Sequence, residues 1–433
     1  MYKSALQLLR AFQQRQYNMY TQSATHVRKN GRLMNDTSTR AADAREQQIA
    51  AQAIGILDKL ISFDTTSCGS NLPLIEYVEE YLAGYGVSAQ RIANKEGSKA
   101  NLLASIGMGT SGGIVLSGHT DTVPVAGQSW TSDPFTLTRR GDRLYGRGTS
   151  DMKSFIALGL AAVPHLLERP ARRPVHLAFS YDEEIGCLGA PDLIRSILEN
   201  GYVPMAAIIG EPTNMTVVNS HKGFDLYRVT ITGREAHSSL VNKGVSANMV
   251  AAELLAVLVE IARAEERSHR DERFEPQWST LTVGTIQGGT ATNILARQCR
   301  FVFDLRCIPG REAEAVLAPF REAVARVSAR IETAGEGAGI LVTRLASIPS
   351  LRPETAGAAE PLSAMLSGID GVGTAVPYSA EAGQFQQAGL SSVICGPGSI
   401  AQAHRADEFI ELSQIDAGAR FIRRLVEFVQ QDT

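Results

Sequence analysis

Histidine and acidic residues follow several short apolar runs of this sequence, at the points where buried strands are expected to end. Taken singly, a histidine in such a place is usually a hydrogen-bonded loop residue, and an acidic pair usually faces solvent. Together these side chains form a nitrogen and oxygen ligand set suited to zinc, cobalt or manganese. The carboxylates are numerous enough for one to be shared by two ions roughly 3.5–4 Å apart. The residues concerned are His119, Asp121, Asp151, Asp182, Glu183, Glu184, Glu211 and His404.

Two of these carboxylates have a second interpretation that the pattern leaves open. Asp151 opens the segment "DMKSFIALGLAAVPHLLE" and could be the N-cap of the helix expected there. Glu211 precedes a proline and could belong to a turn. Among the other histidines, His165 falls within an amphipathic helix and His176 at the start of a strand. We expect those two histidines to be structural.

Alternating helices and strands must position these residues. "REQQIAAQAIGILDKLISF" repeats apolar residues at helical spacing, and a second helix is expected in "NLPLIEYVEEYLAGYG", with Asn71 as its N-cap. "NLLASIG", "GIVLSGH", "VHLAFSYDEE" and "MAAIIGEP" are short apolar runs typical of buried strands. The alternation predicts an α/β fold with a mixed central sheet flanked by helices, and with ligands bound beyond the strand ends.

The pattern changes near residue 218. From there to about residue 347, strands and helices are expected in the order β-α-β-β-α-β, which is the ferredoxin-like arrangement. An α/β pattern returns afterwards, with the strand "SSVICG" and the terminal helix "SQIDAGARFIRRLVEFVQQ". We therefore expect a main domain over residues 41–217 and 348–433, interrupted by a smaller α+β domain over residues 218–347.

Composition excludes several classes of protein. The chain has 433 residues, is 44% hydrophobic and 20% charged, and carries a net charge of −3. These values suit a soluble two-domain protein and give no sign of a nucleic-acid or membrane partner. No apolar run approaches the roughly 20 residues that span a bilayer. Five scattered cysteines without a CxxC pattern favour a reducing compartment, and we expect the cytosol.

Residues 1–40 differ from the rest of the chain. The first 35 residues hold six basic side chains and no acidic one. Such a composition can mark a transit peptide, but the apolar residues are too irregular for an amphipathic targeting helix. We expect a poorly packed extension, or a start codon upstream of a true beginning near Met34.

Five motifs resemble, in order and spacing, those of the metal-dependent aminoacylase/carboxypeptidase family. They are "SGHTDTVP", "GRGTSDMK", "DEEIGCLGA", "GEPTNM" and "GPGSIAQAH". The resemblance runs from about residue 50 to the C-terminus. Members of this family include acetylornithine deacetylases, succinyl-diaminopimelate desuccinylases and glutamate carboxypeptidases. The resemblance implies a catalytic domain that holds two metal ions, interrupted by a lid domain that also forms dimers.

The resemblance also implies a role for each ligand. His119 and Glu211 would bind one ion, and Glu184 and His404 the other. Asp151 would bridge both ions. The cofactor implied is therefore two divalent ions per chain, Zn²⁺ or Co²⁺.

Two further carboxylates would act beside these ligands. Asp121 would accept a hydrogen bond from the other ring nitrogen of His119 and fix its tautomer, because residues i and i+2 of an extended segment point to the same side. Glu183 would be the general base that takes a proton from a water molecule and delivers it to the leaving amine. A metal protein that only binds its ligand needs no such base, so Glu183 argues for catalysis.

Substrate contacts are implied less directly. The motif "TGREAHSS" places His237 where relatives stabilise the developing oxyanion across a dimer interface. Asn293 and Arg306 fall where relatives hold the substrate carboxylate, although Arg306 could instead form a structural ion pair with Asp304 or with a glutamate. Glu381 could pair with a substrate ammonium, but its segment "PYSAEAGQF" has Ser-Ala where Gly-Thr is expected before the glutamate.

The segments "LSGHTDTVPVAGQSWTSDPF" and "REAHSS" are most similar to the acetylornithine deacetylase branch of the family. The reaction that this similarity implies is hydrolysis of N2-acetyl-L-ornithine to ornithine and acetate for arginine synthesis. The alternatives are the same chemistry on another N-acyl amino acid, such as succinyl-diaminopimelate, or on a dipeptide. The expected partners are a small N-acyl amino acid and a second copy of the chain, paired through the inserted domain.

Overall fold

The computed structural model describes residues 37–334, 337–369 and 373–431. The chain forms two compact units. The larger unit comprises Met1–Asn219, Pro353–Thr374 and Ala380–Thr433, and the inserted unit comprises Ser220–Arg352 and Ala375–Ser379. Most of the expected extension, including Met34, lies outside the described residues.

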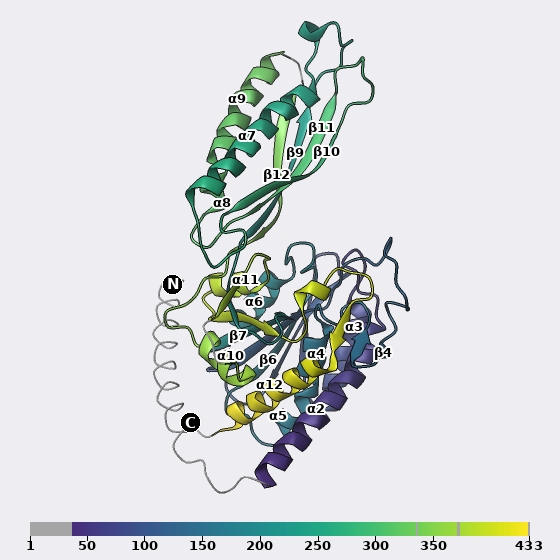
Figure 1. Ribbon diagram of the computed structural model, residues 1–433, viewed down its shortest axis with the longest axis vertical. Coiled ribbons are helices and arrows are strands. Elements are labelled where there is room, and N and C mark those ends of the chain that lie inside the picture. The colour runs from purple at the N-terminus through teal and green to yellow at the C-terminus, as the bar shows by residue number, and fades with distance from the viewer. Residues whose placement is uncertain (1–36, 335–336, 370–372, 432–433) are drawn as a thin grey trace. The chain divides into compact units, whose positions relative to one another are not determined.

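A mixed sheet of eight strands forms the centre of the larger unit (Figure 1). The strand order is β1-β2-β6-β3-β7-β14-β8-β13. Strands β6, β3, β7 and β14 run parallel to their neighbours in this group, whereas β1, β2 and β8 pair antiparallel. The predicted fold class is therefore confirmed. The strands are β1 (Ala89–Ala93), β2 (Ala100–Ile106), β3 (Ile114–His119), β6 (Val175–Ser180), β7 (Ala206–Pro212), β8 (Val218–His221), β13 (Thr374–Val376) and β14 (Ser392–Gly396), and a small separate sheet contains β4 (Thr138–Arg140), β5 (Arg143–Tyr145) and β15 (Phe409–Glu411).

Helices cover both faces of the central sheet. Helices α2, α4 and α12 pack on one another over one face. Successive residues of a strand point to opposite faces, and Leu116 lies in this core while Ser117 bonds to the segment that opens α11. Helix α11 and its neighbour α6 therefore lie on the other face. The helices of this unit are α2 (Thr37–Ile61), α3 (Leu72–Gly84), α4 (Lys153–Ala161), α5 (Val163–Leu167), α6 (Ala190–Glu199), α10 (Ala359–Ser367), α11 (Ala382–Gln387), η2 (Ile400–Gln402) and α12 (Leu412–Gln430).

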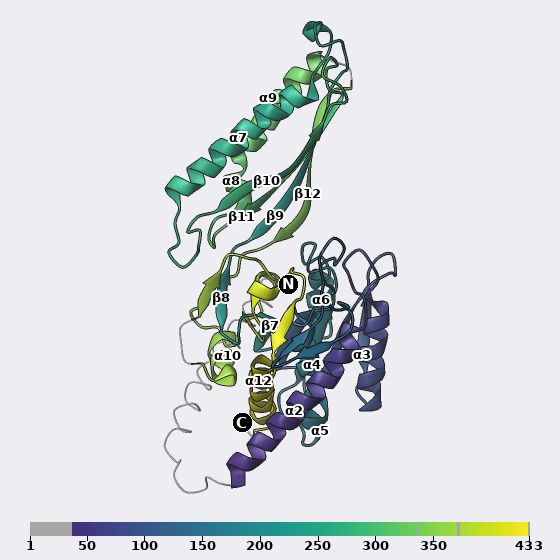
Figure 2. The ribbon, with the colours of Figure 1, turned by 45° about the vertical axis from the view of Figure 1, so that its right-hand side comes forward.

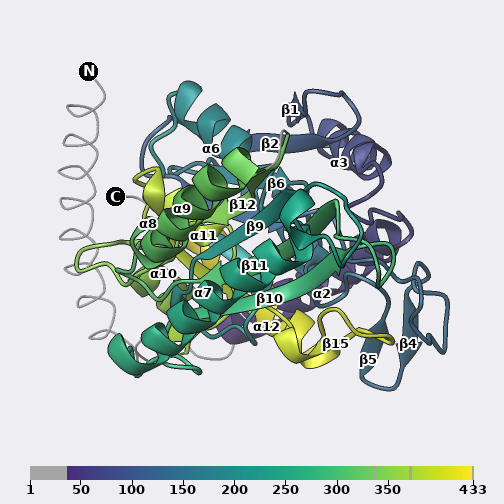
Figure 3. The same ribbon diagram turned by 90° about the horizontal axis from the view of Figure 1, so that it is seen from above.

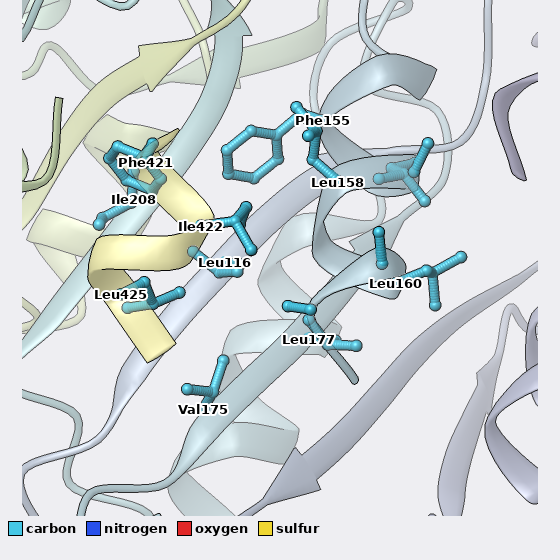
Figure 4. Close-up of a cluster of buried hydrophobic side chains, with 14 of the residues drawn as sticks. Leu116, Phe155, Leu158, Leu160, Val175, Leu177, Ile208, Phe421, Ile422 and Leu425 are labelled. Carbon is cyan, nitrogen blue, oxygen red and sulfur yellow. The ribbon is translucent and has the colours of Figure 1, made fainter. Parts of the chain in front are cut away.

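The main core lies between the sheet and this first helix layer (Figure 4). Phe155 and Leu158 of α4 and Ile422 of α12 face strand residues Leu116 and Leu177 in this cluster. Each is nearly or fully buried, and full burial of such a side chain stabilises the fold by about 1.5–3 kcal/mol. The packed layers hold the ends of β3, β6 and β7 in fixed positions.

Two local features differ from expectation. Helix α2 begins at Thr37, earlier than the segment from residue 45 that the apolar spacing predicts. Residues 37–44 contain alanine and neither proline nor glycine, so nothing in them stops the helix. Asn71 is the N-cap residue of α3, but its side chain makes no cap bond and contacts Ala100 and Thr120 instead.

The inserted unit is a four-stranded antiparallel sheet with two long helices on one face (Figures 2 and 3). Its order β10-β11-β9-β12, with helices after the first and third strands, is the ferredoxin-like arrangement that was predicted. Its own core lies between that face and the helices. The elements are β9 (Phe224–Thr232), η1 (Val241–Lys243), α7 (Ala247–Ser268), β10 (Thr280–Gly288), β11 (Gln298–Arg306), α8 (Ala313–Val316), α9 (Ala318–Ala334) and β12 (Gly339–Ile348).

None of the helices in the described residues is both long and apolar enough to cross a membrane.

Candidate metal centre

Three neighbouring strands bring the predicted residues to one edge of the central sheet. Strand β3 ends at His119, β6 ends just before Glu183 and Glu184, and β7 contains Glu211. These strands are parallel, so their carboxyl ends meet at the same edge. Gly210 allows this packing, because a Cβ there would lie 2.0 Å from the ring of Phe155. The turn interpretation of Glu211 is therefore wrong, since the residue lies within a buried strand.

The other two predicted ligands come from loops. Asp151 precedes helix α4, but the N-cap residue of that helix is Met152, and no side-chain cap bond is formed. The N-cap interpretation of Asp151 is therefore also wrong. His404 follows η2 and has a φ of 62°, in the left-handed region that a non-glycine residue adopts at a cost.

Asp151 directs one carboxylate oxygen to each of two histidines. His119 Nε2 lies 3.1 Å from Asp151 Oδ1 and 3.8 Å from Glu211 Oε1. His404 Nε2 lies 3.5 Å from Asp151 Oδ2 and 2.9 Å from Glu184 Oε2. The candidate ligand atoms in each group of three lie within 4.8 Å of one another. All five predicted ligands are thus brought together in two groups that share Asp151.

The electrostatics of the two groups favour bound cations. Glu211 Oε1 is buried and, within the described part of the chain, has no hydrogen-bond partner. Burial raises the pKa of Glu211 well above its ordinary value, and the neighbouring carboxylates of Asp151 and Glu183 add to the rise. Burial and the charge of Asp151 also raise the pKa of Glu184. Divalent ions would satisfy the orphaned oxygen and offset this repulsion, and the nitrogen and oxygen donors suit zinc or cobalt.

Glu183 belongs to neither group but interacts electrostatically with members of both, His119 in one and Glu184 in the other. Burial raises its pKa to about 8, against the attraction of His119 and together with the repulsion of Glu184 and Glu381. The Cys187 thiol donates a hydrogen bond to Glu183 Oε1 at 3.2 Å. A carboxylate held near the ligands with a raised pKa is suited to take and return a proton near neutral pH.

The contact between Asp121 and His119 differs from the prediction. His119 Nδ1 lies 2.9 Å from the main-chain oxygen of Asp121, and 3.6 Å from its carboxylate Oδ1. The carboxylate accepts hydrogen bonds from Ser67 Oγ at 2.7 Å and from the main-chain nitrogens of Glu183 and Glu184 at 3.1 and 3.2 Å. Asp121 therefore fixes the His119 ring through its backbone, and its side chain holds the turn that carries both glutamates.

Sequence reasoning missed Glu408. Its buried carboxylate accepts a hydrogen bond from the main-chain nitrogen of Asp151 at 3.1 Å and forms an ion pair with buried Arg147. The available signal was weak. Glu408 follows His404 by four residues, and Arg147 stands between two glycines in "GRG".

The four remaining predicted residues do not belong to the ligand groups. Glu381 is a buried residue of the larger unit, where its Oε2 accepts a hydrogen bond from Ser117 Oγ at 3.2 Å. His237, Asn293 and Arg306 all lie in the inserted unit.

Within the inserted unit, these three residues occupy two places. His237 and Asn293 are exposed on adjoining segments, where Ser238 N donates to Asn293 O at 2.9 Å. Arg306 ends β11, with its Nε 3.4 Å from Asp304 Oδ1 and its guanidinium over the Phe224 ring. The alternative of an ion pair with Asp304 is thus present in the structure.

Comparisons with known proteins give a consistent relationship. A model of peptidase family M20/M25/M40 matches residues 115–427. An acetylornithine deacetylase of Myxococcus xanthus is 35% identical over 364 residues, which cover 83% of this chain and 92% of that protein. One from Yersinia pestis is 36% identical over 375 residues, which cover 84% of this chain and 92% of that protein.

Solved structures share the fold. An M20 family metallo-carboxypeptidase from Sulfolobus solfataricus has a TM-score of 0.69 at 18% identity, covering 88% of this chain and 99% of that chain. A dinuclear metal-binding M20 peptidase from Bacillus subtilis has a TM-score of 0.60 at 15% identity, covering 89% and 99%. On the family match and the sequence likeness to both deacetylases, the chain belongs to peptidase family M20/M25/M40 and is a hydrolase of that family.

Proposed function

We propose that this enzyme hydrolyses N2-acetyl-L-ornithine to L-ornithine and acetate, with two Zn²⁺ or Co²⁺ ions per chain. The observation that carries the proposal is the shared carboxylate: Asp151 offers one oxygen to each of two ligand groups, and Glu183 interacts electrostatically with both groups. Relatives named acetylornithine deacetylase support the choice of substrate, because their similarity extends over more than four-fifths of this chain. The five unpaired cysteines fit a cytoplasmic enzyme.

The proposed chemistry divides between the ions and the chain. Divalent ions held at His119, Glu211, Asp151, Glu184 and His404 would supply Lewis acidity to the scissile amide and acidify a water molecule. Glu183 takes a proton from the attacking water and delivers it to the leaving amine nitrogen. Its raised pKa suits both steps, because a stronger base accepts the proton more readily and its acid still releases it to an amine.

Glu381 is our candidate for binding the ornithine ammonium. Its Oε1 is buried and, among the described residues, has no hydrogen-bond partner. Burial raises the pKa of Glu381, so the site favours either a bound proton or a bound cation. A substrate with a side-chain ammonium would satisfy this oxygen, whereas an uncharged N-acyl amino acid would not.

The inserted unit supports a dimer in which sites are completed by the partner. Strand β11 has nine residues, so its ends lie roughly 26 Å apart. His237 and Asn293 lie beyond its Gln298 end, and Arg306 is its last residue. Because one N-acyl amino acid is shorter than this separation, a single inserted unit cannot bring both sets to one substrate. We propose that His237 and Asn293 serve the partner subunit's site.

The pairing surface proposed for this dimer is the β10 edge of the inserted sheet together with α7. Strand β10 is an edge strand, and Ile286 on it is 57% exposed. Met249 on α7 is 72% exposed. An exposed edge strand and apolar side chains of this kind suit a twofold interface between copies.

Metal titration with a substrate panel tests the proposed function. Metal-free enzyme should regain activity on N2-acetyl-L-ornithine as Zn²⁺ or Co²⁺ is added, partly with one ion and fully with two. Succinyl-diaminopimelate and simple dipeptides, offered in parallel, should be poorer substrates. Activity without divalent ions would refute the metal centre, and preference for a dipeptide would refute the deacetylase assignment.

A further inference from the structure

A buried ion pair, Arg147 and Glu408, contacts the backbone of the loop that carries Asp151. Arg147 Nη1 donates to Glu408 Oε2 at 2.8 Å, and each side chain is 1% exposed. Glu408 Oε2 also accepts from Gly148 N at 3.0 Å, and Glu408 Oε1 accepts from Ser150 N at 2.8 Å and Asp151 N at 3.1 Å. A buried pair loses hydration on both sides, and such hydrogen bonds offset that cost. The Glu408 carboxylate thus holds closed the loop that presents the shared ligand.

The other nitrogen of the guanidinium contacts Gln128, which in turn contacts the loop that carries His404. Arg147 Nη2 donates to Gln128 Oε1 at 2.6 Å, and Trp130 Nε1 donates to the same oxygen at 3.2 Å. A guanidinium and an indole N–H can only donate, so they fix the amide oxygen of Gln128 on their side. The Gln128 Nε2 group is left to donate to the main-chain oxygen of His404 at 2.9 Å.

His404 needs such an external bond. Its φ of 62° lies in the left-handed region, where a non-glycine residue is retained only if its surroundings hold it. The side chain of His404 is 56% exposed, so packing alone does not fix its imidazole ring. A hydrogen bond to its carbonyl is therefore well placed to hold the ring toward Glu184 and Asp151.

We propose that Glu408, Arg147 and Gln128 are positioning residues for the two-ion centre. Glu408 positions Asp151, which both ions share, and Arg147 acts through Gln128 on His404, which serves one ion. This inference rests on the proposed function, because it presumes ions at these ligands. It follows that Glu408 governs the affinity for both ions, whereas Gln128 governs the affinity for one.

Calorimetric titration of metal-free protein with Zn²⁺ tests this division. Wild-type protein should bind two ions. Glu408→Gln should weaken both binding constants by about 10–100-fold, the usual range for losing a partner behind a metal ligand. Gln128→Met keeps the side-chain length but loses all three hydrogen bonds of the side-chain amide, and it should weaken the binding of one ion about tenfold and leave the other unchanged.

Glu46→Gln is the matched control. It breaks the Arg423–Glu46 pair of 2.8 Å between α12 and α2, away from the ligand loops, and should bind both ions as the wild type does. Circular dichroism verifies folding, and half-buried Gln128 decides the question if Glu408→Gln does not fold. A folded Gln128→Met that binds both ions normally, or weakens both equally, overturns the inference. Equal weakening in Glu46→Gln also overturns it. A wild-type protein that binds no ion refutes the proposed function instead.

Discussion

The ligand edge of the larger unit and the His237 end of the inserted unit both carry polar side chains beyond strand ends, yet they are held very differently. His119, Asp151 and Glu211 are buried, and loops and strands from distant parts of the chain converge on them. His237 is exposed, and its ring nitrogen Nδ1 forms a hydrogen bond with a near neighbour in the sequence, Ser239 Oγ, at 2.8 Å. The ligand edge is therefore a fixed region, whose side chains are held by many contacts. The exposed segment around His237 is an open region, with few contacts.

The difference corresponds to two kinds of task. Side chains that share a cation must stay within a few tenths of an ångström of one geometry, so the fold accepts the cost of burying their charges. A donor that stabilises charge only in the transition state can wait at the surface, provided another surface brings it to the reaction. We infer that the ligand edge is complete within one chain, whereas the His237 end is not.

The largest expected effect comes from removing Glu183, the general base that we propose in the fixed region. Glu183→Gln keeps the shape of the side chain but cannot take a proton, so kcat should fall by about 10²–10⁴-fold. Metal content, measured by atomic emission, should remain at the wild-type value. The adjacent variant Glu184→Gln is the control and should lose part of one ion instead. The opposite pattern would mean that the roles of these two glutamates are exchanged.

Loss of His237 from the open region should lower activity in a way that a second chain can restore. His237→Ala removes the donor that we propose for the oxyanion, and kcat should fall by about 10²–10³-fold with no loss of metal. Mixing this inactive chain with inactive Glu183→Gln should restore activity after subunit exchange, because a mixed dimer contains one site with both residues intact. If mixed dimers form, as native mass spectrometry would detect, and activity stays absent, His237 does not serve the partner.

The sequence predicted the ligand edge because its signals are local. An apolar run shows where a strand ends, and parallel neighbours end at one edge, so His119 and Glu211 could be expected near each other, whereas their roles as ligands were implied by the family resemblance. The ferredoxin-like order was predictable for the same reason, since alternation of apolar residues distinguishes its strands from its helices.

Other parts depended on contacts between distant segments. Arg147 and Glu408 are 261 residues apart, and a glutamate in "RADEF" resembles an exposed loop residue until the fold closes it over Asp151. The bond between His119 and the Asp121 carbonyl depends on backbone direction after β3, which residue type does not specify. The burial of charged side chains by residues distant in the sequence could not be predicted from the sequence pattern.

A smaller effect, which should depend on the charge of the substrate, is expected from a change at Glu381. Glu381→Gln removes the buried negative charge that we assign to the ornithine ammonium, and a charged hydrogen bond of this kind contributes about 1.5–3 kcal/mol. KM for N2-acetyl-L-ornithine should therefore rise by about 10–100-fold. KM for N-acetyl-L-methionine, which has no side-chain charge, is the internal control and should hardly change. An equal rise for both substrates would assign Glu381 a structural role.

The smallest effect concerns a histidine that is buried without being a ligand. His176 lies in β6, with its Nδ1 hydrogen-bonded to Ser105 Oγ at 2.8 Å and its ring against Tyr202. Burial lowers its pKa from 6.5 to about 4, so the folded state favours the neutral ring. The unfolded chain takes up a proton first as pH falls, and stability is therefore full above pH 6.5 and declines toward pH 4. Between pH 7 and pH 5 the free energy of unfolding should drop by about 2 kcal/mol on this account.

Urea unfolding of wild type and His176→Gln across this pH range measures the effect. The variant lacks the titrating group, so its free energy of unfolding should fall by about 2 kcal/mol less. Parallel pH profiles of the two proteins would show that His176 is not kept neutral by burial.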